Sequence, residues 1–592
     1  MKNKKEIILS VNPCTYGLNY HDPAAMIISD GKILFGVEEE RLNGIKGSKG
    51  LFPQMAINEC LKFCNISKCD ITGVAIGYDP ALWGNRLQLE MEHVLKQCKT
   101  KNRINAIKLM KKINECNLVN RYLFFKDNKN VEELLREKIG IDESVEIKFY
   151  EHHMAHIASA YEVSGFDEAV GVVVDGIGET TVSSVWKIKN HNYEKILDIQ
   201  YPNSLGYFYA IATKFLGFTP WEHEGKTMAL AAYGRKDPQI WNKLMQIINL
   251  KGDIYDVTKF INDNSSEFLM ADENKAISSL EKLLGFPARK KDEPLNDNYK
   301  NFAWAIQEIL ETSVINLVNY AIKQTGIYNV CVAGGVFMNC KMNMVLRENS
   351  NAKNLFVQPL AGDGGLTIGA GLLMSKIKFK GKLNTLAFGP YFNDQQIEQV
   401  LKDKKLKYIK SENIAKDVAN LIANGKIVCW MQGGMEMGAR ALGSRSILAD
   451  PRLPYMSDKI NEIVKHRESW RPFACSVLEE HCKNIFENYN EQKMYPFMIE
   501  AFRVKPEWKD KIPSVIHKAD STSRPQTVNK NTHPLYYKMI SEFYNLTRCP
   551  LVLNTSFNDK GQPIIVNPKL AIEFYEKIQV DAIAMGNFIV ER

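Results

Sequence analysis

The sequence predicts an α/β protein whose first part contains two copies of one folding unit. Residues 6–34 hold apolar strands and a tight Asp-Gly turn, and residues 168–189 repeat this strand–turn–strand pattern around Asp175-Gly-Ile-Gly178. Between and beyond these segments, apolar runs of strand length alternate with helical stretches, which is typical of mixed sheets covered by helices. These observations favour a duplicated α/β domain with a cleft between its halves, and two unrelated hairpins are the alternative.

The individual elements follow this alternation in chain order. The apolar patterns outside the two repeats predict a strand over 145–150, a helix over 152–161, a helix over 301–324, strands over 329–333 and 355–358, and a Gly-rich helix over 362–375. Each strand is short and each helix longer, as expected for buried strands joined by covering helices.

Two stretches have the character of insertions. Residues 83–138 are helical and Lys-rich, and residues 235–299 are polar and interrupted by loops. They contribute either to substrate binding or only to the surface. A domain boundary is expected near residues 376–395, where lysines alternate with small or apolar residues before a new helix begins. We therefore predict an N-terminal domain over residues 1–385 and a C-terminal domain over residues 386–592.

The composition excludes several classes of protein. With 45% hydrophobic and 24% charged residues in 592, the chain is neither mainly disordered nor a coiled coil. No apolar run approaches the roughly 18 residues of a membrane span, and the apolar start is too short for a secretory signal. The 12 cysteines form no CxxC pair, which favours free thiols in a reducing compartment. We therefore expect a cytoplasmic protein. The net charge of +8 permits a nucleic acid or an anionic substrate and requires neither.

A histidine pair stands at helical spacing in Glu151-His-His-Met-Ala-His156. His152 and His156 are four residues apart, so on a helix they share one face, and that face is not the apolar one. Such a pair is a common way to bind a divalent metal from one helix. Asp175 and Asp363 each closely follow an apolar run and stand next to glycine, where the backbone can approach a ligand closely. Either a metal site or structural histidines would explain the pattern.

Several Gly-rich turns could bind phosphate through backbone N–H groups. They contain Gly176, the Gly334-Gly335 pair and Gly362-Asp-Gly-Gly365, each at an expected strand end or helix start. Ordinary turn chemistry is the alternative for each of them. The Gly225-Lys-Thr segment is not a P-loop, because Pro220 stands where that motif requires glycine.

The C-terminal part carries a block of basic residues in segments that are otherwise apolar or rich in Gly and Pro. The block contains Arg440, Arg445, Lys465, Arg467 and Arg471. Arginine favours bidentate contacts with phosphate or carboxylate, so we expect a site for a small anion, with a structural ion-pair network as the alternative. Further along, Arg524 and the segment Leu553-Asn-Thr-Ser-Phe-Asn558 add a cation, hydroxyls and amides at a probable strand end.

These motifs together resemble the O-carbamoyltransferases of nodulation and antibiotic biosynthesis, the NodU/CmcH type. The resemblance runs in order along nearly the whole chain. Besides the histidine pair, it rests on Tyr20-His-Asp-Pro-Ala-Ala25, Glu38-Glu-Glu-Arg41, Ala333-Gly-Gly-Val-Phe-Met-Asn339, Gly362-Asp-Gly-Gly365, Gly438-Ala-Arg-Ala-Leu-Gly-Ser-Arg-Ser446, Trp470-Arg-Pro-Phe-Ala474 and Leu553-Asn-Thr-Ser-Phe-Asn558.

The resemblance implies an ATP-dependent enzyme of secondary metabolism. The N-terminal domain would have a duplicated actin/hexokinase-like (ASKHA) fold, and the C-terminal domain a YrdC-like fold. The C-terminal domain would join carbamoyl phosphate and ATP, with Mg²⁺, into carbamoyl-adenylate and release pyrophosphate. The N-terminal domain, with Fe²⁺ or another divalent metal, would transfer the carbamoyl group to a hydroxyl of a small natural product and release AMP.

The resemblance also assigns roles to individual residues. The metal ligands would be His152, His156, Asp175 and Asp363. His21 would be the base that activates the acceptor hydroxyl, with His153 as the second choice, and Lys46 would face the intermediate. Gly206 and His21 would contact the acceptor. The N-terminal nucleotide loop would contain Gly176, Gly334, Gly335 and Asn339, and the site for carbamoyl phosphate and ATP would contain Arg440, Arg445, Lys465, Arg471, Arg524, Asn554, Thr555 and Ser556.

Two other functions compete with this interpretation. One is a tRNA threonylcarbamoyl-adenosine enzyme with both domains fused, although the sequence has no dense basic stripe interleaved with aromatics, so we do not expect a nucleic acid partner. The other is a non-catalytic nucleotide or metal sensor, which the complete Arg, Lys and Ser set disfavours. Gly47 follows Lys46 where the family often has histidine, so the acceptor stays open. The oligomeric state is also open, with a homodimer as one alternative.

Overall fold

The chain forms two compact units. The computed structural model describes residues 5–14, 21–100, 118–261, 273–490, 493 and 495–592. Unit 1 consists of Met1–Leu34, Lys49–Met338 and Val345–Lys382, and unit 2 of Phe35–Ser48, Asn339–Met344 and Leu383–Arg592. The main division therefore falls three residues before the predicted boundary. In addition, two short segments of the predicted N-terminal domain, Phe35–Ser48 and Asn339–Met344, belong to unit 2, which a single boundary along the sequence cannot describe.

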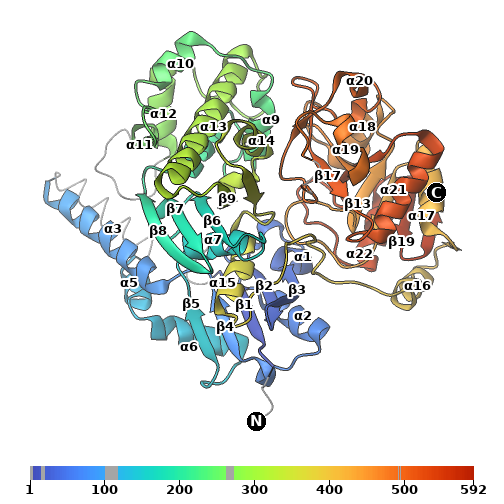
Figure 1. Cartoon of the computed structure of the whole chain (residues 1–592), viewed down its shortest axis with the longest axis horizontal. Coiled ribbons are helices and arrows are strands. Elements are labelled where there is room, and N and C mark those ends of the chain that lie inside the picture. The colour runs from blue at the N-terminus through green and yellow to red at the C-terminus, as the bar shows by residue number, and fades with distance from the viewer. Residues whose placement is uncertain (1–4, 15–20, 101–117, 262–272, 491–492, 494) are drawn as a thin grey trace. The chain divides into compact units, whose positions relative to one another are not determined.

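Unit 1 is built on two five-stranded sheets (Figure 1). The first has the order β3-β2-β1-β4-β5, with β1 Ile8–Asn12, β2 Ala24–Ser29, β3 Lys32–Glu38, β4 Gly73–Ile76 and β5 Glu146–Phe149. The second has the order β10-β9-β6-β7-β8, with β6 Glu168–Val174, β7 Thr181–Lys189, β8 Asn192–Gln200, β9 Asn329–Ala333 and β10 Asn354–Val357.

The two sheets share one topology, which confirms the predicted duplication. In the first, β1 pairs antiparallel with β2 and parallel with β4. In the second, β6 pairs antiparallel with β7 and parallel with β9 in the same way. When the five strands of each sheet are numbered from 1 to 5 in chain order, both sheets have the spatial order 3-2-1-4-5. Unit 1 therefore has the doubled α/β arrangement of the actin/hexokinase-like fold.

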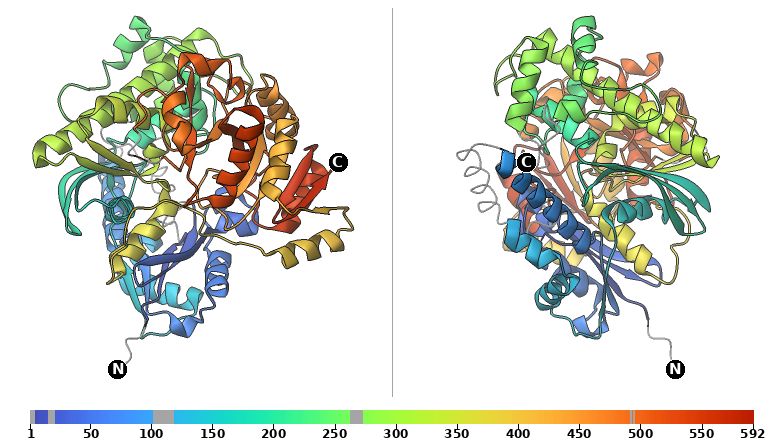
Figure 2. Two further views of the ribbon diagram at one scale, coloured as in Figure 1. Left: turned by 45° about the vertical axis from the view of Figure 1, so that its right-hand side comes forward. Right: turned by 90° about the vertical axis from the view of Figure 1, so that its left-hand side faces the viewer.

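Two helices pack between the sheets of unit 1 and position its functional residues. Helix α7, His152–Tyr161, packs on β6 and β9, and helix α15, Leu366–Met374, packs on β1 and β4 (Figures 1 and 2). The two helices also contact each other, and a side chain on Gly369 would collide with the carbonyl oxygen of Ala155. This close approach fixes the start of α7 relative to the loop that precedes α15.

The remaining helices of unit 1 cover the sheets or lie in the two insertions. They are α2 Gln54–Cys64, α3 Pro80–Thr100, α5 Leu118–Phe125, α6 Asn128–Ile139, α8 Leu205–Phe215, α9 Glu224–Ala231, α10 Pro238–Leu244, α11 Thr258–Ile261, α12 Glu273–Leu284 and α13 Asp297–Thr325. Helix α14, Cys340–Asn349, begins in unit 2 and ends in unit 1. The predicted helix over 152–161 coincides with α7, and the one over 301–324 lies within α13. Residues 101–117 and 262–272 of the insertions lie outside the described residues.

Unit 2 is an α/β unit around one eight-stranded mixed sheet. Its order is β11-β20-β19-β12-β13-β18-β14-β17, with β11 Ile409–Lys410, β12 Val428–Met431, β13 Arg445–Ala449, β14 Ala474–Leu478, β17 Pro525–Val528, β18 Leu551–Ser556, β19 Ala582–Met585 and β20 Phe588–Glu591. The larger covering helices are α16 Asp394–Asp403, α17 Ile414–Ala423, α21 Pro534–Thr547 and α22 Pro568–Lys577. The α/β class is thus confirmed for both units, while the YrdC-like fold of unit 2 stays a prediction.

Short elements complete unit 2. They are α1 Glu39–Asn43, α18 Met456–Ile460, α19 Cys482–Ile485, α20 Pro506–Lys509 and the β15–β16 pair, Phe502–Arg503 with Thr522–Ser523. Among the helices of the described residues in both units, none combines the length and apolar character needed to cross a membrane.

Candidate active site

Four side chains of unit 1 converge on one point. His152 and His156 stand one turn apart on α7, and their Nε2 atoms lie 3.0 Å from each other. Each Nε2 also lies 3.1 Å from Oδ2 of Asp175. Oδ1 of Asp363 lies 3.7 Å from Nε2 of His152 and 3.5 Å from Nε2 of His156. The structure therefore brings together all four residues that the sequence predicted as metal ligands.

Backbone groups hold Asp175 in this position. Asp175 directly follows β6, and its Oδ1 accepts the N–H groups of Gly176 at 2.8 Å and Gly335 at 3.1 Å. With Oδ1 occupied in this way, Oδ2 faces the two imidazoles. The N–H of Gly334 is also used, by the carbonyl of Ala361 at 2.9 Å. This differs from the predicted phosphate loop, because these three N–H groups bond to the protein itself and orient a carboxylate.

The cluster fits a divalent cation. Its four ligand atoms all lie within 4.8 Å of one another. Donor atoms bound about 2.1 Å from one ion at right angles are about 3.0 Å apart, which matches the three shortest separations. Two imidazoles and two carboxylates form a donor set suited to iron, zinc or manganese. The carboxylate held by backbone N–H groups has the outer support usual for a metal ligand.

The electrostatics of the cluster also favour positive charge. Burial alone would lower the pKa of His156, but hydrogen bonds to Asp175 and Asp363 outweigh it and raise that pKa to about 9. Burial alone would raise the pKa of Asp175, yet its hydrogen bonds with His152 and His156 hold it well below the usual value. His152 and Asp175 are buried, His156 is fully inaccessible and Asp363 is half-buried, so a cation here would be largely shielded from bulk water.

Other predicted residues of the transfer site occupy different positions around the cluster. His21 is half-buried; burial lowers its pKa, while Asp363 and Asp175 act in the opposite direction, which places the imidazole within the field of the cluster. His153 is fully buried, and its Nδ1 contacts Ser184 Oγ on β7 at 2.8 Å instead of the metal ligands. Burial holds its pKa well below the usual value.

The remaining predicted residues of this region have mainly backbone roles or belong to unit 2. A side chain on Gly206, at the start of α8, would collide with the backbone of Gly176, so Gly206 allows α8 to pack on the turn after Asp175. Asn339 belongs to unit 2, where its Oδ1 accepts the N–H of Met342 and so caps α14. Lys46 also belongs to unit 2, and its Nζ lies 3.0 Å from Oε1 of Glu40.

Unit 2 contains a second cluster, composed of cations. Arg471 and Arg524 precede β14 and β17, which are parallel neighbours, so both side chains start at the same edge of the sheet. The charge of Arg524, followed by burial and the charge of Arg471, lowers the pKa of Arg440 to about 9. Burial and then the charges of Arg471 and Arg524 lower the pKa of Arg467 to about 9. These arginines thus repel one another in the absence of an anion.

Lys465 lies against the end of β18 at the same edge. Its Nζ donates to the carbonyls of Ser556 at 2.6 Å and Asn558 at 2.9 Å, and to Oδ1 of Asn558 at 2.7 Å. Burial, with the charge of Arg467 as the next cause, lowers its pKa to about 7, against the surrounding oxygens that favour the ammonium form. The only acidic group with which these cations form an ion pair among the described residues is Glu468, 3.8 Å from Arg471. The cluster is therefore suited to bind phosphate groups.

Two predicted residues of this site have structural contacts. The guanidinium of Arg445 is fully buried and donates to the carbonyls of Gln432, Gly433, Ser444 and Pro390. Asn554 is buried, and its Nδ2 donates to Ala441 O at 3.1 Å and Ser476 Oγ at 2.9 Å. Both therefore hold neighbouring loops in place. Thr555 and Ser556 follow Asn554 on β18 and are half-buried at the cation edge.

Two residues join the cation cluster beyond those that the family resemblance assigned to the carbamoyl phosphate and ATP site, and one of them, Arg467, already belonged to the predicted basic block. Arg467 shares the cluster through its charge, and Asn558 bonds with both Lys465 and Ser556. Both lay inside sequence segments already quoted for their motifs. The sequence signal that could have identified them is their distance from assigned residues: Arg467 is two residues after Lys465, and Asn558 is two residues after Ser556.

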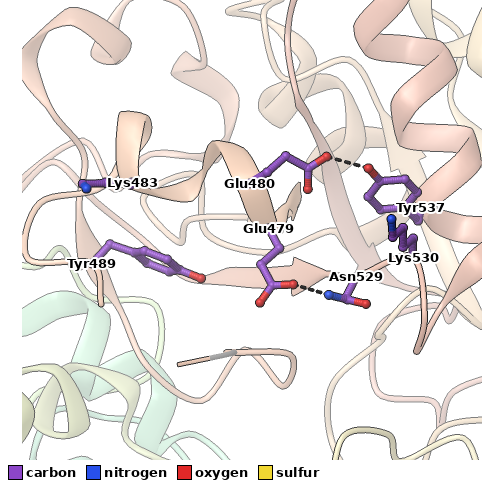
Figure 3. Close-up of a pocket in the computed structure, with 7 residues that line it drawn as sticks. All are labelled: Glu479, Glu480, Lys483, Tyr489, Asn529, Lys530 and Tyr537. Carbon is purple, nitrogen blue, oxygen red and sulfur yellow. Dashed lines mark hydrogen bonds between the residues drawn. The ribbon is translucent and has the colours of Figure 1, made fainter. Parts of the chain in front are cut away.

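A separate groove of about 460 Å³ lies at the other ends of β14 and β17 (Figure 3). Glu479 and Asn529 follow these strands directly and bond to each other, and Glu480 accepts the hydroxyl of Tyr537 at 2.6 Å. Its walls carry charges of both signs that are largely satisfied internally. The groove is thus distinct from the cation cluster, which lies at the opposite ends of β14 and β17.

The solved structures that this chain resembles give weak likenesses. HypF of T. kodakarensis has a TM-score of 0.31 at 14% identity, covering 62% of this chain and 47% of that one. A ROK hexokinase from Thermus thermophilus has a TM-score of 0.28 at 12% identity, covering 62% of this chain and 97% of that one.

The sequence comparisons are much stronger. Nodulation protein NolNO of Sinorhizobium fredii is 30% identical over 97% of this chain and 79% of its own length. Nodulation protein NolO of Bradyrhizobium diazoefficiens is 33% identical over 74% of this chain and 78% of its own. An uncharacterized protein of Synechocystis is 32% identical over 97% and 95%. Residues 14–372 match the carbamoyltransferase N-terminus and residues 419–592 the carbamoyltransferase C-terminus. The chain belongs to the carbamoyltransferase family.

Proposed function

We propose that this carbamoyltransferase works in two steps at the two clusters. In unit 2, water splits carbamoyl phosphate into carbamate and phosphate, and a carbamate oxygen attacks the α-phosphorus of ATP, expelling pyrophosphate. In unit 1, a hydroxyl oxygen of a small molecule attacks the carbamoyl carbon, and AMP leaves. The phosphorus balance requires both phosphate and pyrophosphate as products, because the adenylate keeps one of four phosphorus atoms.

The observation that carries this proposal is the opposite charge of the two clusters. The first step handles two polyanions, carbamoyl phosphate and ATP, and unit 2 offers a set of cations at one sheet edge of which, among the described residues, only Arg471 forms an ion pair, with Glu468. Arg440, Arg471 and Arg524 would offset the charge that develops on the phosphorus atoms, and Lys465 would contact phosphate from the end of β18. The mutual repulsion of these groups would be relieved by the bound anions.

The transfer step is assigned to unit 1. His152, His156, Asp175 and Asp363 would hold Fe²⁺ or another divalent metal. When bound, such an ion polarises a carbonyl or a phosphoryl oxygen. His21, half-buried near the cluster with a lowered pKa, would take the proton of the acceptor hydroxyl as its oxygen attacks. Its neutral form is the one able to accept that proton. His153, bonded to Ser184 and directed away, is the weaker candidate for this base.

The residues of the site constrain the identity of the acceptor least. We propose a hydroxyl-bearing small molecule of secondary metabolism, such as an antibiotic precursor, and not RNA. The sequence contains no dense stripe of basic residues interleaved with aromatics of the kind that binds nucleic acid.

The test is to supply purified protein with Fe²⁺ under anaerobic conditions, carbamoyl phosphate and ATP. Pyrophosphate and phosphate should be released together, and the release should depend on both substrates. A panel of polyhydroxylated sugars and aminoglycosides, analysed by mass spectrometry, should then reveal a compound that gains one carbamoyl group. Absence of pyrophosphate release from protein with a full metal complement would exclude the proposed first step.

A further inference from the structure

The motif Glu38-Glu-Glu-Arg41 has no role in the steps above, although it is unusually buried. It spans the end of β3 and the start of α1, within the segment Phe35–Ser48 that belongs to unit 2. The four consecutive charged residues are 7%, 4%, 6% and 3% exposed. Burial of charge is costly unless each group finds a partner, so the contacts of this motif indicate what it holds.

Glu38 and Arg41 bind both backbone groups of one glycine. Oε1 of Glu38 accepts the N–H of Gly438, and Nη2 of Arg41 donates to the carbonyl of Gly438 at 2.6 Å. The two side chains also pair with each other, with 3.5 Å between Nε and Oε2. Gly438 has φ of 90°, a conformation that favours glycine. Glu38 and Arg41 thus fix the two peptide groups that flank the α-carbon of Gly438.

The clamped glycine stands two residues before Arg440 of the cation cluster. Beyond Arg440, the buried carboxylate of Glu436 accepts the N–H groups of Leu442 at 2.6 Å and Arg445 at 3.2 Å. The loop that carries Arg440 is therefore fixed on both sides by buried carboxylates. Such fixing has a physical purpose, because Arg440 faces the like charge of Arg524 and a free loop would move away from it.

The same motif also orients Lys46. Oε1 of Glu40 lies 3.0 Å from Nζ of Lys46 and 3.0 Å from Nη1 of Arg41, while Oε2 accepts the N–H of Gly47 at 2.6 Å. One continuous set of ionic contacts thus connects Lys46 to the Arg440 loop through Glu40, Arg41 and Glu38.

We propose that Glu38 and Arg41 are positioning residues that hold the Arg440 loop in place for phosphate binding in unit 2. The inference rests on the proposed adenylate-forming function of that unit. Neither residue needs to touch a substrate. They would act by keeping the Arg440 guanidinium directed toward the bound anion although the neighbouring arginines repel it. The site would thus be organised before the substrate binds.

The experiment measures carbamoyl phosphate-dependent exchange of labelled pyrophosphate into ATP in the full chain. Arg41→Met removes the carbonyl contact, Glu38→Gln weakens the charge of the clamp, and Gly438→Ala shifts the clamped peptide without touching an ionic group. The control is Arg452→Met, because Arg452 pairs with buried Asp450, with Nη2 and Oδ2 2.6 Å apart, beyond β13 from the Arg440 loop; Arg452 itself is more exposed than Arg41. Melting temperatures are measured for every variant.

We expect Arg41→Met and Gly438→Ala to lower kcat/KM for exchange by about 100-fold. Most of the loss should be a raised KM for the phosphate substrates, with Glu38→Gln intermediate. Arg452→Met should lower the melting temperature, because it leaves buried Asp450 without its arginine, and should leave exchange unchanged. Equal losses in the control, or wild-type kinetics in Gly438→Ala, would overturn the inference. If the wild-type protein shows no exchange, the proposed function fails, and binding of sulfate to wild type and Gly438→Ala tests the clamp by itself.

Discussion

The two clusters of this protein are opposites in charge and similar in design. In unit 1, two carboxylates face two imidazoles, an arrangement that favours a cation. In unit 2, four arginines and a lysine form a single ion pair among the described residues, between Arg471 and Glu468, an arrangement that favours anions. Each cluster is electrostatically incomplete without a ligand, and each is fixed by groups that never reach the ligand. Gly176 and Gly335 hold Asp175, while Glu436 fixes the loop of Arg440. The difference teaches that opposite ligands require separate sites, because neither cluster could hold the partner of the other.

The largest expected effect comes from removing charge in the first cluster. Asp175→Asn keeps the shape of the side chain but removes the anion that both imidazoles face. We expect the bound metal to be lost and carbamoyl transfer to fall by about 1,000-fold, since a metal contributes several kcal/mol to the transition state. Metal analysis and product formation measure the two effects. A variant that keeps its full metal complement would show that Asp175 is not a ligand.

The corresponding change in unit 2 is Arg524→Ala. We expect pyrophosphate exchange to fall by about 100-fold, as for loss of one preorganised donor, while the metal content stays normal. Because Arg524 repels Arg440, the ligand-free protein should melt at the same or a higher temperature. Lys402→Ala, which removes an exposed lysine from its ion pair with Glu398 on α16, is the control. A lower melting temperature in Arg524→Ala would mean that the cations stabilise the fold, contrary to the comparison.

A smaller effect is expected from disturbing the support of Asp175. A side chain at Gly335 would place a carbon 3.0 Å from Oδ1 of that carboxylate. Gly335→Ala should therefore weaken metal affinity about tenfold, the size typical of changes in outer support. Competition with a chelator measures the affinity. Gly225→Ala, where an added carbon meets nothing within 4 Å, should match the wild type.

The smallest effect is a dependence of anion binding on pH. With its pKa lowered to about 7, Lys465 is charged below that pH and loses its proton above it. Sulfate, whose charge is constant over this range, should bind a few-fold more tightly at pH 6 than at pH 8.5, and Lys465→Met should remove the difference. Without ligand, stability should rise with pH above about 7, because the unfolded chain keeps the proton that the folded chain has lost. Calorimetry with sulfate and thermal melts measure both trends.

The sequence predicted the first cluster well because its signals are local. The histidine pair depends on helical spacing, and Asp175 and Asp363 stand beside glycines after apolar runs, so α7 and these four candidate ligands follow from short patterns. The repeated hairpin likewise predicted the doubled sheets. The use of Gly334 and Gly335 was not predictable, since a Gly-rich turn can offer its N–H groups to a phosphate or to a carboxylate of the protein.

The second cluster was predicted only in part because its contacts join distant residues. Spacing identified a basic block, but it could not show that Arg445 bonds to backbone carbonyls while Arg467 joins the cations. The contact of Glu38 with Gly438 joins residues 400 positions apart, and no local pattern indicates it. For the same reason, no single boundary could have assigned Phe35–Ser48 to unit 2.

The central claim is that the two clusters serve separate steps, and pyrophosphate exchange in His156→Ala tests it most directly. This variant lacks one imidazole of unit 1 and leaves every cation of unit 2 in place. We predict exchange dependent on carbamoyl phosphate at the wild-type rate, together with loss of carbamoyl transfer to any acceptor. Loss of exchange along with transfer, in a variant that melts like the wild type, would contradict the assignment of the two steps to two sites.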